Sequence, residues 1–538
     1  MNPNTTSTSP DSPPTAMGAS AARGMGWMFA SNLSAKVLTV AAQVVALAVL
    51  SQEQMGLFAL ALAVQMFVQT FRDGGLREWL VSRAERYGEL AGTTYWLAFT
   101  INCAVALLLV AAGWVVGWAY DAPELIWLMI ISASALPLGT PAVILSAKLR
   151  LEHRFKDLAR ISALSAFARY TSQIVFCLTG FGAMAMVLPI VVNTVVEWWL
   201  TIRADRTPPR PWSLPAEPSR WRGILTDTFW LILTSSTIGI VNQGYLALSG
   251  FEKAELGQYN TAVLVLMQVE TLLTMSIMAV ALPVFTRQRD DTPRLASTAL
   301  RLVRSMALLG AVLCGGAAVT FAHLETAVFG GKWAEVSLPR AILAVAYPLR
   351  TILLCVPHCL LQAQHRFRDL FFLWLRNCAG LLIVTLLAGR FWPTPTGLAT
   401  FVAVYLAATS LLSTTLTLRP LGIAPASTLR ACLAALLLAA LAAAAGWAAA
   451  EFATPSVVNL VQTLAPARPL ADGLIGPPEP GRLGLLLQGT ALAAIAGGVF
   501  SGIMATLLRL ALPDHLRDLL SVMPARLAGP AGRLLRLN

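Results

Sequence analysis

Long apolar runs alternate with short polar loops along the whole chain, and this pattern predicts a series of membrane-spanning segments. Fourteen runs approach or exceed the roughly 20 residues that a helix needs to cross a ~30 Å hydrocarbon core. Strands of a membrane barrel would be nearer ten residues and would alternate strictly, so we expect an all-α polytopic membrane protein. The predicted spans are residues 26–49, 55–73, 93–119, 124–148, 158–180, 183–202, 224–249, 256–286, 302–324, 338–363, 370–391, 396–418, 428–450 and 484–508.

The basic residues predict how these spans are oriented. The 538-residue chain has a net charge of +12, although only 12% of its residues are charged. Most Lys and Arg residues fall in every second loop, which the positive-inside rule assigns to the cytoplasm. We therefore predict a multi-pass protein of the bacterial inner membrane with both termini cytoplasmic. Because topology explains the basic excess, no nucleic-acid partner is predicted.

The two halves of the chain resemble each other. Residues 55–58 and 256–259 each place an apolar-Gly pair and an aromatic residue after a short acidic loop. Each half has six spans that start from the cytoplasm, so the repeats are parallel, which suits alternating access at a central cleft. The predicted organisation is a disordered cytoplasmic tail (1–22), an N-lobe (23–202), a Pro-rich cytoplasmic linker (203–223), a C-lobe (224–418), two further helices (419–508) with an outer loop (451–483), and a cytoplasmic tail (509–538). The prolines of the linker predict a stiff, extended segment.

Cations inside the predicted spans are the first candidate binding residues, because a charge at membrane depth is costly and usually faces a cavity or a partner. Lys36 shares one helical face with Asn32 and Gln43, a pattern that favours a wet cavity over a lysine that snorkels toward the cytoplasm. Arg169 lies near the centre of its span, where either a cavity or a structural ion pair would hold it. Arg350 is similarly central in the tenth span.

Acidic, amide and proline residues complete the candidate site. Glu270, near mid-depth in the eighth span, is expected either to bind a proton or to neutralise an arginine. The other candidate amides are Gln65, Gln173 and Gln243. Proline removes backbone hydrogen bonds, and the candidate hinges are Pro137, Pro141 and Pro348. The seven cysteines lack metal-ligand spacing and no phosphate-binding loop sequence is found, so no metal or cofactor is predicted.

Several sequence segments resemble those of a known family. They are QMGLFALALAV at 54–64, FRDGGLREWLVSR at 71–83, LGQYNTAVLVL at 256–266 and ALPVFTRQ at 281–288. Together with the arrangement of six, six and two spans, they are similar to the polysaccharide transporter family. These are the oligosaccharide flippases of the multidrug/oligosaccharidyl-lipid/polysaccharide exporter superfamily. Residues 73–76 fill the Asp-Gly-Leu-like turn of that family, whereas Met55 stands where relatives often have Tyr. The resemblance covers about residues 23–420.

The resemblance implies a two-lobed, V-shaped helical bundle that acts as a transporter and not as an enzyme. The implied substrate is an undecaprenyl-pyrophosphate-linked oligosaccharide repeat unit, turned to the outer leaflet for exopolysaccharide or lipopolysaccharide synthesis. Membrane lipid, a polysaccharide polymerase and glycosyltransferases are the implied partners. In this interpretation Lys36, Arg169 and Arg350 hold the pyrophosphate, because Arg binds two phosphate oxygens at once and Lys acts as a point charge.

Three alternatives stay open. A peptidoglycan-precursor lipid flippase of the same superfamily would also have fourteen spans. A multidrug or cation exporter would be expected to carry an acidic residue in the first span, where this chain has Lys36. A membrane glycosyltransferase or polymerase would need catalytic carboxylates in long outer loops, and loop 451–483 offers only Glu451, Asp472 and Glu479.

Overall fold

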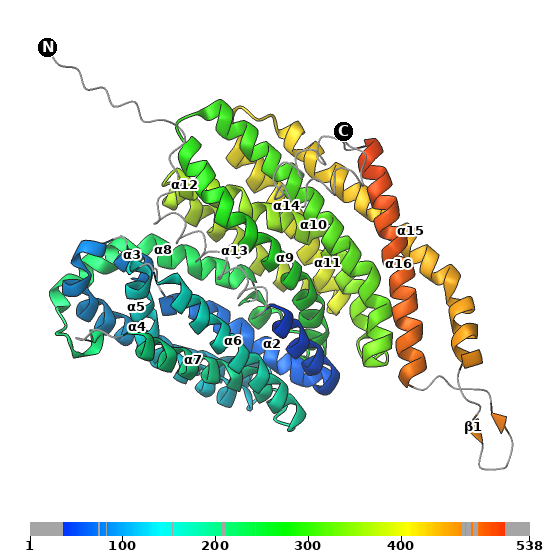
Figure 1. The fold of residues 1–538 in the computed structure, drawn as a ribbon, viewed down its shortest axis with the longest axis horizontal. Coiled ribbons are helices and arrows are strands. Elements are labelled where there is room, and N and C mark those ends of the chain that lie inside the picture. The colour runs from blue at the N-terminus through cyan, green and yellow to red at the C-terminus, as the bar shows by residue number, and fades with distance from the viewer. Residues whose placement is uncertain are drawn as a thin grey trace. The chain divides into compact units, whose positions relative to one another are not determined.

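Helices make up nearly all of the described chain. The computed structural model describes residues 36–73, 76–81, 83–152, 154–205, 210–242, 244–464, 468–469, 475–476 and 482–511. Within these ranges the strands are β1 (Arg468–Pro469) and β2 (Ile475–Gly476), which pair antiparallel with Arg468 opposite Gly476. The all-helical membrane architecture expected from the apolar runs is therefore confirmed (Figure 1).

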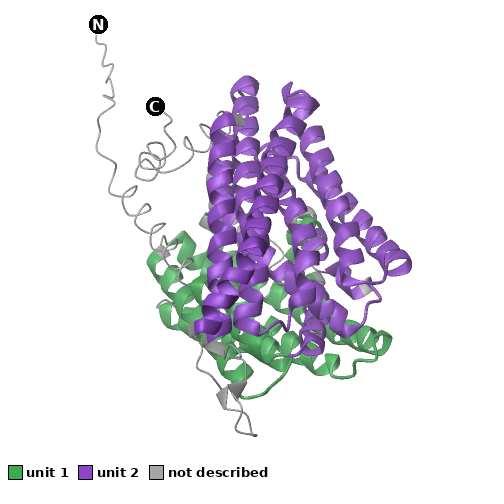
Figure 2. Cartoon of the chain, turned by 90° about the vertical axis from the view of Figure 1, so that its right-hand side faces the viewer, with its two compact units in different colours: residues 1–50, 64–236 green, residues 51–63, 237–538 purple. Residues whose placement is uncertain are grey.

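The chain forms two compact units (Figure 2). Unit 1 comprises residues 1–50 and 64–236, so its described part begins with a helix at Lys36–Val49. Its other elements are the second half of α2 (Gln52–Asp73), α3 (Leu76–Val81), η1 (Ala84–Arg86), α4 (Tyr87–Ala119), α5 (Leu125–Leu151), α6 (Phe155–Leu178), α7 (Met184–Ala204), η2 (Pro211–Ser213), η3 (Pro218–Arg220) and most of α8 (Trp221–Asn242). The predicted N-lobe boundary at residue 202 thus differs from the unit boundary, which lies within α8.

Unit 2 comprises residues 51–63 and 237–538. After the first half of α2 and the end of α8, its elements are η4 (Gly244–Leu248), α9 (Lys253–Gln288), α10 (Thr292–Phe329), η5 (Ala334–Val336), α11 (Ser337–Cys355), α12 (Pro357–Ala363), α13 (Phe367–Phe391), α14 (Pro395–Leu418), η6 (Arg419–Leu421), α15 (Pro425–Leu464) and α16 (Arg482–Ala511). Its main apolar core joins α10 to α11, α15 and α16, with side chains such as Met306 and Phe500 almost fully buried.

Ten of the described helices are long and apolar enough to cross a membrane, and eleven if the two halves of α8, bent by 51°, count as one span. All of them fall on predicted runs. The first predicted span is visible only as the shorter apolar helix Lys36–Val49, because residues 26–35 lie outside the described chain. Helices α2 and α9 coincide with two further predicted spans, at 55–73 and 256–286. The count of fourteen spans stays a prediction.

Helix α15 is longer than the sequence predicts. It continues through Pro455 to Leu464, so the predicted outer loop at 451–483 is helical over its first part. The predicted span ended at residue 450, because Glu451 interrupts the apolar run. In the structure the helix continues beyond this charge, and side chains such as Phe452 lie exposed on its surface.

The Pro-rich linker is fixed to α4 and is not a free extended spacer. The backbone N–H of Glu217 donates to the Thr93 hydroxyl at 3.2 Å, and Trp96 Nε1 donates to the Leu214 carbonyl at 3.3 Å. The rings of Trp212 and Tyr95 lie 6.1 Å apart. Two 3₁₀ turns, η2 and η3, give the segment these contacts, so its expected extended conformation is wrong for residues 211–213 and 218–220.

Gly92 allows this docking, which leads to a first prediction. A Cβ on Gly92 would lie 2.4 Å from the Leu214 Cβ, whereas one on Gly88 would meet nothing within 4 Å. Gly92→Val should therefore detach the linker and make the peptide bond after Arg220 accessible to trypsin, with cleavage of the detergent-solubilised protein faster by roughly fivefold or more for a loss of 1–3 kcal/mol. Gly88→Val is the matched control. Equal cleavage of both variants and the unaltered protein would contradict the docking.

The two repeat motifs seen in the sequence meet inside unit 2. A Cβ on Gly56 would lie 1.6 Å from the Lys253 carbonyl oxygen, and one on Gly257 would lie 2.0 Å from the Gln52 carbonyl oxygen. Gln258 Nε2 donates to Gln52 Oε1 at 3.1 Å and also to a Glu335 carboxylate oxygen. The starts of α2 and α9 thus cross at backbone contact, and only glycine permits this approach at both positions.

Candidate functional site

A buried ion pair lies within unit 2. Arg350 of α11 places its Nε 3.4 Å from Oε1 of Glu270 on α9, and the two side chains are only 3% and 6% exposed. A charge is stable at such depth only when another group compensates it. The structure thus places the predicted cation of the tenth span beside the predicted acid of the eighth.

Neutral side chains complete the surroundings of Arg350. Its Nη2 donates to Asn242 Oδ1, at the end of α8, and its Nη1 donates to the Tyr347 hydroxyl at 3.4 Å. The hydroxyls of Tyr245 and Tyr259 lie 2.8 Å apart in the same buried region, and Arg350 acts on both electrostatically. The sequence marked Tyr259 only as the aromatic residue of the second repeat motif, and neither tyrosine was predicted to be a site residue.

Two other predicted cations lie in unit 1 and have no such carboxylate partner among the described residues. Lys36, at the start of the described chain, and Arg169, on α6, are both half-buried. The guanidinium carbon of Arg169 lies 5.6 Å from the ring centroid of Tyr170. Within the described chain, neither cation has a carboxylate within ion-pair distance. In the part of the chain that the structure describes, these two positive charges therefore lack the carboxylate partner that Arg350 has.

The predicted amides divide into three groups. Gln65 Nε2 donates to Ser132 Oγ at 2.6 Å, and Gln173 Nε2 lies 3.2 Å from Met186 Sδ, so both tie helices together within unit 1. Gln43 is half-buried on the helix that begins at Lys36. Asn32 and Gln243 lie outside the described residues.

The predicted hinge prolines do not break their helices. Pro137 and Pro141 lie inside the continuous α5, and Pro348 lies inside α11. Pro348 packs closely on α10, because a Cβ at Gly310 would approach its Cα to 2.9 Å. The break instead falls at Val356, between α11 and α12, where Pro357 begins the next helix.

Arg340 is a second buried cation of α11, near the start of the predicted span 338–363. It lies in the first turns of the helix and is fully buried. Its guanidinium carbon stands 4.0 Å from the ring centroid of Phe321, and Glu325 is its charged neighbour. The Glu325 carboxylate also accepts the Trp333 N–H at 2.6 Å, so this pair fixes the connection from α10 to α11.

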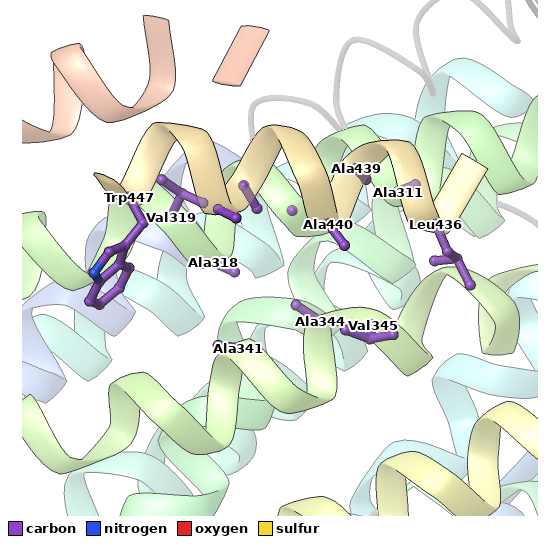
Figure 3. A pocket seen from close by; sticks show the side chains of 13 residues that line it. Ala311, Ala318, Val319, Ala341, Ala344, Val345, Leu436, Ala439, Ala440 and Trp447 are labelled. Atoms are coloured by element: carbon purple, nitrogen blue, oxygen red, sulfur yellow. The ribbon is translucent and has the colours of Figure 1, made fainter. Parts of the chain in front are cut away.

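An apolar pocket lies between α10, α11 and α15 in unit 2 (Figure 3). Its volume is about 230 Å³, and its walls are mainly alanines, with Val319, Leu436 and Trp447 beside them. No charged residue lines it. Such a lining can accept a hydrocarbon chain but offers nothing to a phosphate, so a charged headgroup must be bound elsewhere.

Comparisons with known proteins agree with these features. A family described as polysaccharide biosynthesis protein matches residues 46–338. The succinoglycan biosynthesis transport protein ExoT of Rhizobium meliloti (strain 1021) is 22% identical over 325 residues, which are 60% of this chain. The match spans 65% of the length of ExoT, slightly under two thirds.

Solved structures share the fold. The lipid II flippase MurJ, in an inward closed conformation, is 12% identical with a TM-score of 0.64, covering 89% of this chain and 99% of MurJ. An inward-facing multidrug resistance MATE family transporter of the MOP superfamily is 14% identical with a TM-score of 0.58, covering 72% of this chain and 94% of its own. At these identities the likeness shows the fold alone. The comparisons confirm the family resemblance predicted from the sequence, and the relatives that they name are transporters and a flippase.

Proposed function

Because the chain belongs to the polysaccharide biosynthesis protein family, we propose that it is a flippase for a lipid-linked oligosaccharide in the bacterial inner membrane. The proposed substrate is an undecaprenyl-pyrophosphate-linked repeat unit of a surface polysaccharide. The proposed mechanism is alternating access in a chain of fourteen spans with both termini cytoplasmic. A polymerase and glycosyltransferases are the proposed partners that consume and supply the substrate.

The uncompensated cations of unit 1 carry the proposal. Lys36 and Arg169 are half-buried in predicted spans and have no carboxylate partner within the described chain. An unpaired charge at this depth costs several kcal/mol, and an anionic ligand would remove that cost. A pyrophosphate supplies the charge and the paired oxygens that an arginine fork binds. The neighbouring Gln43 would offer its amide to the sugar.

Arg350 and Glu270 would act as a coupled pair. In the structure Glu270 neutralises Arg350. Protonation of Glu270 would release Arg350 to bind phosphate, so the pair links proton binding to the headgroup. Asn32, Gln65, Gln173 and Gln243 remain proposed sugar ligands, and Pro137, Pro141 and Pro348 remain proposed hinges.

The pair gives a second prediction. Arg350→Ala should destabilise the protein by about 3–5 kcal/mol, because it leaves Glu270 buried without its partner. The double variant Arg350→Ala/Glu270→Ala should recover most of this loss while export stays defective. Thermal unfolding of the purified protein and surface polymer in cells measure the two effects. Equal stability of the single and double variants would show that the two charges are not coupled.

A peptidoglycan-precursor lipid flippase is the alternative proposal, since the lipid II flippase MurJ shares the fold. Its substrate carries the same pyrophosphate, so the cations alone do not separate the two. A multidrug exporter fits less well, since Lys36 and Arg169 would repel a cationic drug. Reconstitution with each lipid-linked substrate separates these functions and tests the proposal.

A further inference from the structure

A second cavity of unit 2 has a different chemistry from the apolar pocket. Its volume is about 390 Å³, and it lies where α12, α13 and α14 meet. Arginine, aspartate and hydroxyl side chains line one part, and leucine, phenylalanine and proline line the other. The lining residues are Leu361, Arg366, Asp369, Phe372, Leu373, Arg376, Ser413, Leu416, Thr417 and Pro420.

The polar part of this cavity carries a net positive charge. Arg366 pairs with Asp369 at 2.7 Å, and both side chains are about half exposed. Arg376 Nη2 donates to Ser413 Oγ at 2.6 Å, and no carboxylate of the described chain lies within ion-pair distance of it. Arg368 adds a further positive charge close by, with its guanidinium carbon 5.7 Å from the ring centroid of Phe372. This region thus contains three arginines and one carboxylate, that of Asp369.

The apolar part continues along the surface of two helices. Phe372 and Leu416 line the cavity and are 48% and 47% exposed. Exposed apolar side chains follow at helical spacings on both helices, away from the charged end. They are Leu375, Ile383 and Leu386 on α13 and Leu412 and Val404 on α14. An amphiphile would match both surfaces, with its anionic head at the arginines and its hydrocarbon tails along the apolar faces of α13 and α14.

We propose that this cavity binds the headgroup phosphate of an anionic glycerophospholipid, with the acyl chains lying along α13 and α14. Arginine binds phosphate oxygens through paired N–H groups. Basic pockets between membrane helices at their cytoplasmic side recognise such headgroups. The site is exposed at the helix surface, which suits a lipid of the surrounding leaflet better than a substrate held in a closed cleft. The proposal is independent of the transported substrate.

Lipid binding to the purified full chain tests this site. The protein in neutral detergent is mixed with phosphatidylglycerol, phosphatidylcholine, glycerol phosphate or undecaprenyl phosphate, and bound lipid is counted by native mass spectrometry alongside thermal unfolding. We expect phosphatidylglycerol to bind and to raise the unfolding temperature, while phosphatidylcholine and glycerol phosphate do neither. Each arginine near the headgroup should account for about a fivefold change in affinity. Arg366→Gln/Arg376→Gln should therefore bind phosphatidylglycerol roughly 25-fold more weakly.

The matched control is Arg390→Gln, which removes an exposed arginine from the opposite end of the same helix. It should leave phosphatidylglycerol binding unchanged. Equal binding by the double variant and the unaltered protein would overturn the proposal, because the arginines would then only snorkel to the interface. Preferential binding of undecaprenyl phosphate would overturn it in favour of a substrate-loading site, and binding of glycerol phosphate would reduce it to a simple anion site.

Discussion

Arg169→Ala is expected to stop export of the polymer while the protein still inserts at its normal level. Arg169 lies on α6, half-buried and without a carboxylate partner in the described chain, so its removal leaves no buried charge behind. Folding in lipid depends mainly on the packing of the helices, which this change hardly touches. Loss of one charge-assisted contact to phosphate corresponds to a roughly 10- to 100-fold lower rate. Surface polymer per unit of membrane protein measures the effect.

Two further variants make this test specific. Arg169→Lys should restore export only in part, because it keeps the charge but loses the paired contact. Arg160→Ala, which removes an exposed arginine from the same helix, should export normally. If Arg169→Ala exported as much polymer as the unaltered protein, Arg169 would have no role in binding. A fall in export that matched a fall in membrane protein would instead assign it a structural role.

Gly257→Ala is expected to prevent the correct folding of unit 2. The added Cβ would lie 2.0 Å from the backbone oxygen of Gln52 and 2.9 Å from the backbone nitrogen of Gly56. Neither atom is the end of a flexible side chain, so the start of α2 must move away from α9. We expect a loss of at least about 3 kcal/mol, seen as a lower unfolding temperature and less protein in the membrane.

Gly498→Ala is the control for this change. Gly498 also lies in a helix of unit 2, but a Cβ there would meet nothing within 4 Å. Alanine is the better helix former, so this variant should be neutral or slightly more stable. Gly56→Ala should behave like Gly257→Ala, because its Cβ would lie 1.6 Å from the Lys253 oxygen. Normal stability of both variants would show that the crossing does not hold the two helix starts together.

Apolar periodicity was enough to predict most of the helices, because lipid and core burial both select long apolar runs. It could not predict the contacts between segments that are distant in the sequence. The sequence showed the paired glycine motifs at Gly56 and Gly257 but not that each faces the backbone of the other helix. The sequence likewise did not predict that the Pro-rich linker docks on α4, because Thr93 and Trp96, which hold the segment, lie far from it along the chain.

For the charged residues too, the sequence predicted which residues matter but not what surrounds them. Arg350 and Glu270 could be selected from the sequence, because a charge within an apolar run is conspicuous. Their surroundings of Asn242 and three tyrosines depend on how α8, η4, α9 and α11 pack. Arg340 lies near the start of a predicted span with nothing in the sequence to mark it as buried, whereas its packing beside Phe321 and Glu325 of α10 buries it completely. Burial at a helix end is decided by tertiary packing and leaves no periodic pattern.

The flippase proposal is tested most directly by transbilayer movement of its substrate in liposomes. The purified full chain is reconstituted with a fluorescent undecaprenyl-pyrophosphate oligosaccharide, and an impermeant quencher reports how fast the inner-leaflet label reaches the outside. We expect movement well above that of empty liposomes, lost with Arg169→Ala and kept with Arg160→Ala. Movement no faster than in empty liposomes, from protein that unfolds at the normal temperature, would contradict it.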